Sequence, residues 1–255
     1  MSNPVQKNAL VTGAGKRLGR HIALALAARG WNVAVHYGSS ASEAHATVAE
    51  IEALGRKAVA LECDLADETA ASKLLARAAD ALGPITCLVN NASLFSYDDA
   101  RSVNAASLDR HMHVNLRAPL LLAQALAAAT PAGAQSVVIN LLDQKLANLN
   151  PDYLSYTLSK AALQTATVML AQALAPALRV VGVAPGLTLL SGDQTEEEFQ
   201  RAHAMTPLKR ASGPEDVAAA VCFAAESPAI TGTTLYVDGG QHLLALPRDV
   251  MFIAK

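Results

Sequence analysis

Short apolar runs alternate with longer amphipathic, alanine-rich stretches along the whole chain. An uninterrupted apolar run of about four to eight residues favours a strand buried on both faces, whereas apolar residues spaced three and four apart favour a helix. The pattern predicts strands at Ala9–Thr12, Asn32–Tyr37, Lys57–Glu62, Cys87–Asn90, Ser136–Asn140, Arg179–Ala184 and Leu235–Val237. Between them it predicts helices at Leu18–Arg29, Ser42–Leu54, Thr69–Leu82, Ser107–Ala129, Tyr153–Leu174 and Pro214–Ala225.

This alternation predicts the fold class. Parallel strands joined by right-handed helical crossovers form an open sheet with helices on both faces. We therefore expect an α/β protein with a Rossmann-like, doubly wound parallel sheet of about seven strands. We expect a single domain over residues 1–255, with a nucleotide-binding part over about 1–135 and a catalytic and substrate-loop part over about 136–255.

One segment departs from this rhythm. It runs from Gly186 to Gly213 and contains three consecutive acids, Glu196, Glu197 and Glu198. Because it follows the carboxyl end of a strand, where such sheets bind ligands, we expect a mobile flap over the substrate. The alternative is a solvated surface helix.

Charge and apolar length argue against polymeric or membrane partners. The net charge is −2, the pI is about 6.4, and basic residues are scattered, so we expect neither nucleic acid nor an anionic membrane surface as a partner. The first apolar strand begins within ten residues, so we expect no signal peptide. Gln172, Pro176 and Arg179 interrupt the longest apolar stretch, so we expect no span of a bilayer.

The sulfur and imidazole residues point to a reduced, metal-free protein. Cys63, Cys87 and Cys222 form no CxxC pair, and we expect buried thiols in a cytoplasmic protein. His111 and His113 are two apart on a predicted helix and face different directions, so we expect no metal site.

A glycine-rich turn follows the first strand and opens the first helix. It reads TGAGKRLG, from Thr12 to Gly19. Glycines there let the backbone approach a pyrophosphate, which the helix N-terminus then holds. A tight turn without a ligand has the same glycines, but the strand–turn–helix setting favours a nucleotide. We expect contacts from Gly13, Gly15, Arg17, Leu18 and Gly19.

The second strand ends in HYGSS, from His36 to Ser40, which lacks the carboxylate that binds the ribose 2′-hydroxyl of NAD. Arg17 and the hydroxyls of Ser39 and Ser40 suit a 2′-phosphate instead. The sequence therefore predicts NADPH/NADP. Asp64 would accept a hydrogen bond from the adenine amino group or cap the following turn. The remaining cofactor contacts expected in this half are His36, Tyr37, Leu65, Asn91, Ala92 and Ser93.

The catalytic candidates are Asp143, Tyr156 and Lys160. On a helix Tyr156 and Lys160 lie one turn apart on one face. The ammonium favours the phenolate, so we expect it to lower the tyrosine pKa from about 10 and give a proton donor and acceptor usable near neutral pH.

Several of these motifs together resemble one family, the short-chain dehydrogenase/reductases, across essentially the whole chain. They are TGAGKRLG, NNA at Asn90 to Ala92, Asn115, Tyr156-x-x-x-Lys160 and Pro185–Gly186. The resemblance implies a nicotinamide-dependent oxidoreductase that is usually a homotetramer.

The resemblance also implies roles. Tyr156 is the acid/base, Lys160 binds the nicotinamide ribose, and the helix carrying Asn115 supports a proton relay through water to Lys160. Pro185 and Gly186 would lie against the nicotinamide, with Thr188 near its carboxamide or the phosphates.

Two departures narrow the resemblance. Arg17 stands where the family commonly has glycine, and Asp143 stands where it has serine. With HY-x-x-S, NNAS-x-F and PGLTLL, they resemble the pteridine reductase and dihydromonapterin reductase branch. That branch implies that Arg17 binds the cofactor phosphates and contacts the substrate. It implies that Ser93 and Phe95 contact a pterin, and that Asp143 and Tyr156 handle protons. Unlike better-known members of the branch, this chain has no basic side chain at Gly38 or Ser39.

The carboxyl group of Asp143 points the same way by its chemistry. An ionised carboxylate only accepts hydrogen bonds, so it would repel the alkoxide that develops when a ketone is reduced. Its negative charge would also raise the pKa of Tyr156. It suits a substrate whose ring N–H faces it, or whose nitrogen takes a proton as carbon takes hydride, such as a dihydropterin. The alternatives are a protonated Asp143 that donates as serine does, and an Asp that only caps the loop.

The flat ring of Phe95 would hold such a heterocycle against the nicotinamide, unless it is packed in the core. Tyr153 would also line the pocket. The tail RDVMFIAK, from Arg248 to Lys255, is expected at a subunit interface or over a neighbouring subunit's pocket.

The sequence thus predicts an NADPH-dependent reductase of a pterin C=N bond. The first alternative is a general ketone, alcohol or 3-oxoacyl reductase. The second is a non-catalytic nucleotide-sensing protein, against which the Tyr156 and Lys160 pair argues.

Overall fold

The computed structural model describes residues 7–190, 194–210 and 212–253. Its strands form one parallel sheet in the order β3-β2-β1-β4-β5-β6-β7, which confirms the predicted fold class. The strands are β1 (Asn8–Val11), β2 (Asn32–Tyr37), β3 (Ala58–Glu62), β4 (Cys87–Asn90), β5 (Ser136–Leu141), β6 (Leu178–Pro185) and β7 (Thr234–Val237).

The helices lie between the strands, as the alternating pattern predicts. They are α1 (Arg17–Ala28), α2 (Ala41–Ala53), α3 (Glu68–Leu82), α4 (Ala105–Met112), the π-helical η1 (His113–Arg117), α5 (Ala118–Ala129), the 3-10 turn η2 (Gln144–Ala147), α6 (Leu154–Ala173), α7 (Glu196–Met205), α8 (Pro214–Glu226), the 3-10 turn η3 (Gln241–Leu243) and α9 (Val250–Ile253).

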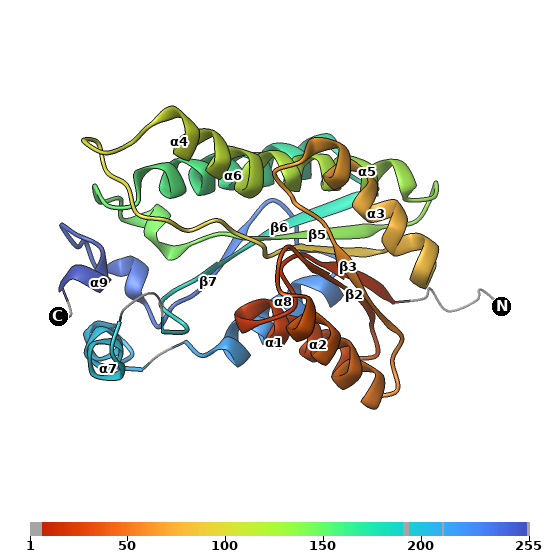
Figure 1. The fold of residues 1–255 in the computed structure, drawn as a ribbon, viewed down its shortest axis with the longest axis horizontal. Coiled ribbons are helices and arrows are strands. Elements are labelled where there is room, and N and C mark those ends of the chain that lie inside the picture. Colours follow the sequence, from red (N-terminus) through yellow and green to blue (C-terminus); the bar gives the residue numbers. More distant parts are fainter. Residues whose placement is uncertain (1–6, 191–193, 211, 254–255) are drawn as a thin grey trace.

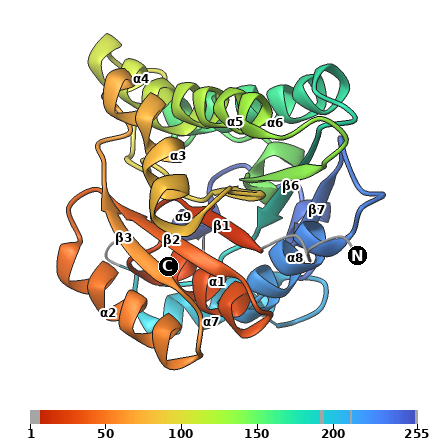
Figure 2. The ribbon, with the colours of Figure 1, turned by 90° about the vertical axis from the view of Figure 1, so that its right-hand side faces the viewer.

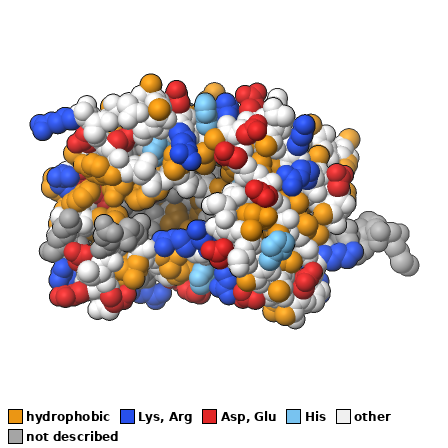
Figure 3. All heavy atoms as spheres, in the orientation of Figure 1, with side chains coloured by type: hydrophobic (Ala, Val, Ile, Leu, Met, Phe, Trp, Pro, Cys, Tyr) orange, Lys and Arg blue, Asp and Glu red, His pale blue; other side chains and the backbone are white. Residues whose placement is uncertain are grey.

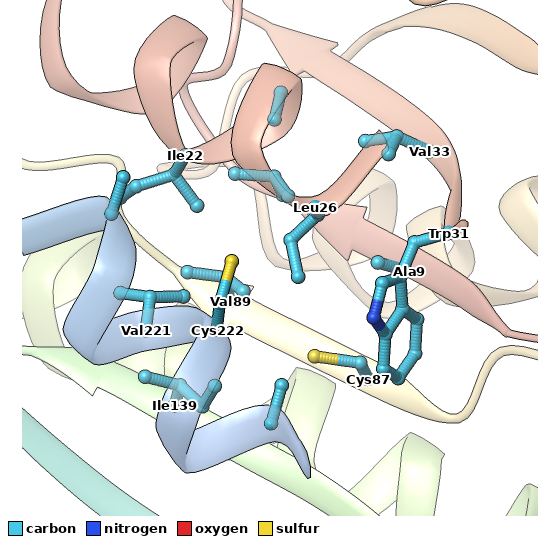
Figure 4. Close-up of a cluster of buried hydrophobic side chains, with 14 of the residues drawn as sticks. Ala9, Ile22, Leu26, Trp31, Val33, Cys87, Val89, Ile139, Val221 and Cys222 are labelled. Carbon is cyan, nitrogen blue, oxygen red and sulfur yellow. The ribbon is translucent and has the colours of Figure 1, made fainter. Parts of the chain in front are cut away.

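Two helical layers sandwich the sheet. Helices α3, α4, α5 and α6 cover one face, and α1, α2 and α8 cover the other (Figures 1 and 2). Figure 4 shows Ile22 and Leu26 of α1 meeting Val221 and Cys222 of α8 above strand residues such as Val89. Each fully buried side chain of this size contributes roughly 1.5–3 kcal/mol, so these contacts fix α1 and the turn before it on the sheet.

The order of the strands reverses between β1 and β4. Strand β1 pairs with β2 on one side and with β4 on the other, both in parallel register. Ligands of doubly wound sheets bind beyond the carboxyl ends of the strands at such a point. The glycine-rich turn after β1 and the loop after β4 both begin there.

Two helices differ from the prediction. The helix predicted over Ser107–Ala129 begins at Ala105 and contains the π-helical turn η1, with Asn115 at its middle. Single π-turns inside helices are frequently found at functional sites. Helix α6 begins at Leu154, because Tyr153 takes a left-handed conformation with φ of 56°.

The segment predicted as a flap contains the helix α7. A capping box between Thr195 and Glu198 starts it, so the acidic run forms the surface helix that was the alternative. Residues 191–193 and 211 of the predicted flap lie outside the described residues. Motion of this segment stays a prediction.

Cys63, Cys87 and Cys222 are free and buried, as predicted. In the part of the chain that the structure describes, no helix has the length and apolarity needed to cross a bilayer. On the face drawn in Figure 3, acidic and basic side chains are interspersed around a central hollow.

Candidate active site

A cavity of about 450 Å³ opens where the strand order reverses. It lies between the glycine-rich turn, the end of β2, the loop after β4 and the loop after β6. Most of the predicted cofactor residues line it: Gly13, Gly15, Arg17, Leu18, Gly19, Tyr37, Ser39, Ser40, Asn91, Ala92, Ser93 and Thr188. Lys16, Gly38 and Leu189 also line it and were not predicted. Lys16 could have been predicted, because it is a basic residue inside the glycine-rich turn.

Hydrogen bonds hold the glycine-rich turn against the end of β4. Asn91 Nδ2 donates hydrogen bonds to the carbonyls of Thr12 and Gly13 at 2.9 and 3.2 Å. A Cβ on Gly19 would lie 2.1 Å from the Gly13 oxygen and 2.5 Å from Asn91 Nδ2. Only glycine allows this approach, so Gly19 sets the distance between the turn and the first turn of α1.

His36 supports the turn from below. The Gly13 backbone N–H donates to His36 Nδ1 at 3.0 Å, so Nε2 carries the proton and donates to the Cys63 carbonyl at 3.0 Å. Burial lowers the pKa of His36 to about 4, and the ring is therefore neutral at pH 7. Both ring nitrogens are occupied by backbone groups, so His36 holds the turn. The ring also lines a smaller cavity beside the turn, and its cofactor contact stays a prediction.

Arg17 connects the glycine-rich turn to the loop after β6. Its Nη2 donates to the Leu190 carbonyl at 2.7 Å, and its φ of 51° turns the chain into α1. The exposed guanidinium thus lies beside the cavity, between the predicted phosphate and substrate segments.

Asp64 and Leu65 line a smaller cavity of about 180 Å³, which shares Gly13, Ala92 and Ser93 with the main one. Asp64 Oδ1 accepts from the Ala66 N–H at 2.9 Å, so the turn-capping alternative is present. Asp64 also lines this smaller cavity, and its contact with the adenine stays a prediction.

The three catalytic candidates come together at the carboxyl edge of β5. Tyr156 Oη donates to Asp143 Oδ2 at 2.7 Å. Asp143 follows β5 and caps η2, since its Oδ1 accepts from the Lys145 N–H at 2.8 Å. Lys160, one turn after Tyr156 on α6, donates from Nζ to the Leu141 carbonyl at 2.7 Å. Asp143 therefore caps its loop and binds the phenol at the same time.

The pKa of Tyr156 differs from the prediction. Burial raises it well above 10, and the charge and hydrogen bond of Asp143 raise it further. The lowering expected from Lys160 was wrong, whereas the rise expected from an ionised Asp143 is present, because the carboxyl group is in direct contact with the phenol. The phenol therefore keeps its proton at neutral pH.

Burial also shifts the partners of Tyr156. It lowers the pKa of Lys160 to about 8, against the attraction of Asp143. It raises the pKa of Asp143, against hydrogen bonds from the Lys145 N–H and Tyr156 and the charge of Lys160. The buried phenol and the half-buried carboxyl group thus share one hydrogen bond, and the pocket can hold a proton on either of them.

Asn115 braces the loop after β4 against α6. Its Nδ2 donates to Ser159 Oγ at 3.0 Å and to the Leu94 carbonyl at 2.9 Å, and its Oδ1 accepts from the Leu94 N–H at 2.8 Å. Ser159 immediately precedes Lys160. This contact places Asn115 beside the catalytic helix, while its water relay stays a prediction.

Phe95 lies at the surface next to the catalytic phenol. It is 41% exposed, which excludes the core-packed alternative. Its ring centroid lies 4.7 Å from that of Tyr156 in an edge-to-face contact and 4.3 Å from that of Tyr153 in a stacked one. Tyr97 and Phe252 continue this cluster and were not predicted. The spacing of Phe95 and Tyr97 in one loop was a usable signal for Tyr97.

Pro185 and Gly186 lie at the end of β6, outside the lining of the main cavity. The Gly186 N–H donates to the Val237 carbonyl at 3.0 Å. A Cβ on Gly186 would lie 2.8 Å from Asp238 Cβ, so glycine allows β6 and the end of β7 to lie close together.

The C-terminal tail was expected at a subunit interface or over a neighbouring subunit's pocket. Its described part, residues 248–253, packs on the catalytic end of its own chain, and the contact with another subunit stays a prediction. Arg248 forms a salt bridge with Asp152 just before α6, at 2.7 Å. Residues 254–255 lie outside the described residues. The ion pair of Arg248 with Asp152 holds the tail at this place. The two residues lie far apart in the sequence, so a local pattern does not predict the contact.

Comparison with known proteins gives reductases and a dehydrogenase. A family model described as enoyl-(acyl carrier protein) reductase matches residues 13–242. The crystal structure of FolM alternative dihydrofolate reductase 1 from Brucella canis, complexed with NADP, is 40% identical with a TM-score of 0.88, covering 93% of this chain and 95% of that one.

Two curated relatives have similar identities. L-rhamnose 1-dehydrogenase (NAD(P)(+)) from Sphingomonas sp. is 33% identical over 93% of this chain and 96% of that protein. 3-oxoacyl-[acyl-carrier-protein] reductase FabG from Staphylococcus epidermidis is 32% identical over 94% of this chain and 100% of that protein. These names share oxidoreductase chemistry and differ in substrate.

Proposed function

The chain belongs to the short-chain dehydrogenase/reductase family, and we propose that it is an NADPH-dependent reductase of the C=N bond of a dihydropterin. The observation that carries this substrate is the contact of the Asp143 carboxyl with the Tyr156 phenol at 2.7 Å. A serine hydroxyl there would serve a ketone, whereas a carboxyl group serves a substrate nitrogen.

The cavity at the glycine-rich turn suits NADPH. The turn offers backbone N–H groups at a helix N-terminus, and Lys16 and Arg17 add positive charge beside it. Ser39 and Ser40 face the same cavity, and among the residues that the structure describes no carboxylate lines it. The NADP complex of the Brucella FolM relative supports this cofactor. Bound NADPH would supply a hydride to the substrate carbon.

Reduction of a C=N bond needs one hydride at carbon and one proton at nitrogen. The raised pKa of Tyr156 keeps the phenol protonated, and the raised pKa of Asp143 lets the carboxyl hold a proton closer to neutral pH than an exposed Asp. We assign proton delivery to this pair. Lys160, held by the Leu141 carbonyl, would orient the nicotinamide ribose.

The substrate would lie on the exposed ring of Phe95. A flat heterocycle stacked there gains about 0.5–1.5 kcal/mol beyond the burial of its surface. Ser93, two residues before Phe95, and Arg17 both line the main cavity, so both are proposed substrate contacts. The likeness to the Brucella alternative dihydrofolate reductase supports a pterin, because dihydrofolate carries a dihydropterin ring.

A ketone or 3-oxoacyl reductase is the second candidate. Burial raises the pKa of Asp143, and a protonated carboxyl can donate to a ketone oxygen as serine does. The rhamnose dehydrogenase and FabG relatives support this alternative. A non-catalytic nucleotide sensor gains no support, since it needs no buried Tyr156 and Asp143 pair.

The test is NADPH oxidation measured with dihydrobiopterin, dihydrofolate, a 3-oxoacyl thioester and simple ketones. We expect the dihydropterins to be preferred by about 100-fold in kcat/KM. Asp143→Ser should lower kcat/KM for dihydropterins by about 100-fold while keeping or raising that for ketones. Asp143→Asn, similar in shape but unable to hold a proton, is the matched control and should lower both. Turnover of ketones without turnover of any pterin would reject the pterin assignment.

We further propose one domain over residues 1–255, a homotetramer and a cytoplasmic location. The three buried free thiols support a reducing compartment. Light scattering of the purified protein tests the tetramer.

A further inference from the structure

The C-terminal segment Arg248–Ile253, called the C-terminal clasp below, is tied to the residue before the catalytic helix. Arg248 donates from Nε and Nη2 to both carboxylate oxygens of Asp152, at 2.7–3.0 Å. The Asp249 N–H donates to Asp152 Oδ2 at 2.8 Å. Asp152 is only 1% exposed, so the clasp provides the partners of a buried carboxylate.

Lys145 joins this clasp to the proton-handling pair. Its buried Nζ donates to Asp249 Oδ2 at 3.1 Å and to the Asp152 carbonyl at 2.7 Å. The backbone N–H of the same residue donates to Asp143 Oδ1 at 2.8 Å. Lys145 therefore links Asp249, which binds its side chain, to Asp143, which binds its backbone N–H and Tyr156.

The clasp also contacts the aromatic side of the site. Phe252 stacks on Tyr153 with ring centroids 6.2 Å apart, and Tyr153 Oη donates to Met251 Sδ at 3.7 Å. Tyr153 in turn stacks on Phe95, the proposed platform for the substrate. The clasp thus contacts both the proton-handling side and the ring side of the pocket.

The charges around the pair come from several elements. Asp143 faces Lys160 of α6, the Asp249 carboxylate pairs with Lys145 of η2, and the Asp152 carboxylate pairs with Arg248 of the clasp. The Lys145 and Asp249 side chains are 5% and 15% exposed, so water screens them little. The charge of Asp249 raises the pKa of both Asp143 and Tyr156.

We propose that the C-terminal clasp is part of the active site, and that Lys145 and Asp249 are positioning residues that hold Asp143 against Tyr156 and balance the charge around that pair. The inference rests on the proton-handling role of Asp143 and Tyr156 proposed above, and not on the pterin. A buried ion pair costs desolvation energy, so its place beside these two acids indicates a role in setting their charge state.

The test breaks the ion pair from either side. Asp249→Asn and Lys145→Met both abolish the ion pair, so a merely structural role would affect the pH profile of the two variants alike. Asp249→Asn removes a negative charge and should shift the profile of kcat/KM to lower pH by about one unit. Lys145→Met leaves Asp249 unbalanced and should shift it to higher pH by a similar amount. Lys145→Arg should restore the wild-type profile.

The control is the ion pair of Lys7 and Glu226, at 2.8 Å, between the start of β1 and the end of α8. Lys7→Met and Glu226→Gln should leave the pH profile unchanged. The profile is measured with any substrate that the wild type reduces, so failure on pterins alone leaves this test intact. Titration of the Asp143 carboxyl by ¹³C NMR, assigned with Asp143→Asn, gives the same comparison without turnover. Shifts in the same direction in both variants, or no shift in either, overturn the inference.

Discussion

The glycine-rich turn and the proton-handling pocket lie at the same edge of the sheet and are built in opposite ways. The turn is held by neutral groups, namely backbone amides, the Asn91 amide and the uncharged His36 ring. The pocket is held by buried ionisable groups, with Asp143, Lys145 and Lys160 all in direct hydrogen bonds.

The difference follows from what each region has to do. A turn held by neutral groups leaves the positive potential of the α1 N-terminus free for the phosphates of a ligand, whereas countercharges there would compete with the cofactor. A pocket that moves protons needs groups whose charge can change, and burial brings the pKa values of Asp143 and Lys160 toward the working range. Substitutions in the two regions should therefore have separable effects, on cofactor binding in one and on chemistry in the other.

The largest expected effect is on chemistry alone. Tyr156→Phe removes the phenolic proton and should lower kcat by about 1000-fold, within the range that a general acid contributes. The NADPH dissociation constant, from fluorescence titration, should stay within about threefold, since the turn is untouched. A comparable loss of NADPH binding would mean that the two regions are not separable.

The next effect belongs to the turn. Gly19→Ala places a methyl group 2.1 Å from the Gly13 oxygen, which forces the turn and α1 apart. We expect a loss of about 3 kcal/mol in the free energy of unfolding and at least a 100-fold weaker NADPH affinity. Alanine normally stabilises a helix relative to glycine, so the sign of the change is diagnostic.

Gly38→Ala is the matched control for stability, because a Cβ there meets no atom within 4 Å. Urea unfolding of both variants measures the difference. Equal stabilities would contradict the packing argument.

Acid should lower the free energy of unfolding through His36, which supports the turn. The folded-state pKa of His36 is about 4, below the unfolded value of 6.5, so the unfolded state binds more protons between these pH values. Stability is therefore present above pH 6.5 and is lost as the pH falls toward 4. We expect a loss of about 2 kcal/mol between pH 7 and pH 5.

His36→Asn keeps an acceptor for the Gly13 N–H but does not titrate, so this share of the acid loss should disappear. Urea unfolding at both pH values, for wild type and variant, isolates the histidine. Parallel pH dependence in the two proteins would contradict the buried neutral ring.

The smallest effect is the response of the pocket to base. The pKa of Lys160 is lowered to about 8, whereas that of Tyr156 is raised, so the first group to lose its proton is the lysine. We expect kcat/KM for reduction to fall above pH 8 by about tenfold per pH unit. His36→Asn should leave this limb in place. A profile that stays flat to about pH 9.5 would show that the ammonium charge is not needed.

Local features of the sequence determined the frame of this protein. Each predicted strand is present, with ends displaced by one residue at most, because apolar runs and their turns are local patterns. The glycine-rich turn and the one-turn spacing of Tyr156 and Lys160 were equally readable, since helix geometry alone places them on one face.

The tertiary structure decided which charged groups meet and how the pKa values of the catalytic residues shift. Asp249 meets Lys145 across 104 residues of sequence, and Arg248 meets Asp152 across 96, so no local pattern predicts either pair. The π-helical turn at Asn115 accompanies side-chain contacts 21 and 44 residues away. The pKa of Tyr156 is raised because the folded chain buries the phenol and places Asp143 against it. A side chain's type and spacing follow from sequence, whereas its burial and its charged neighbours depend on how distant segments pack.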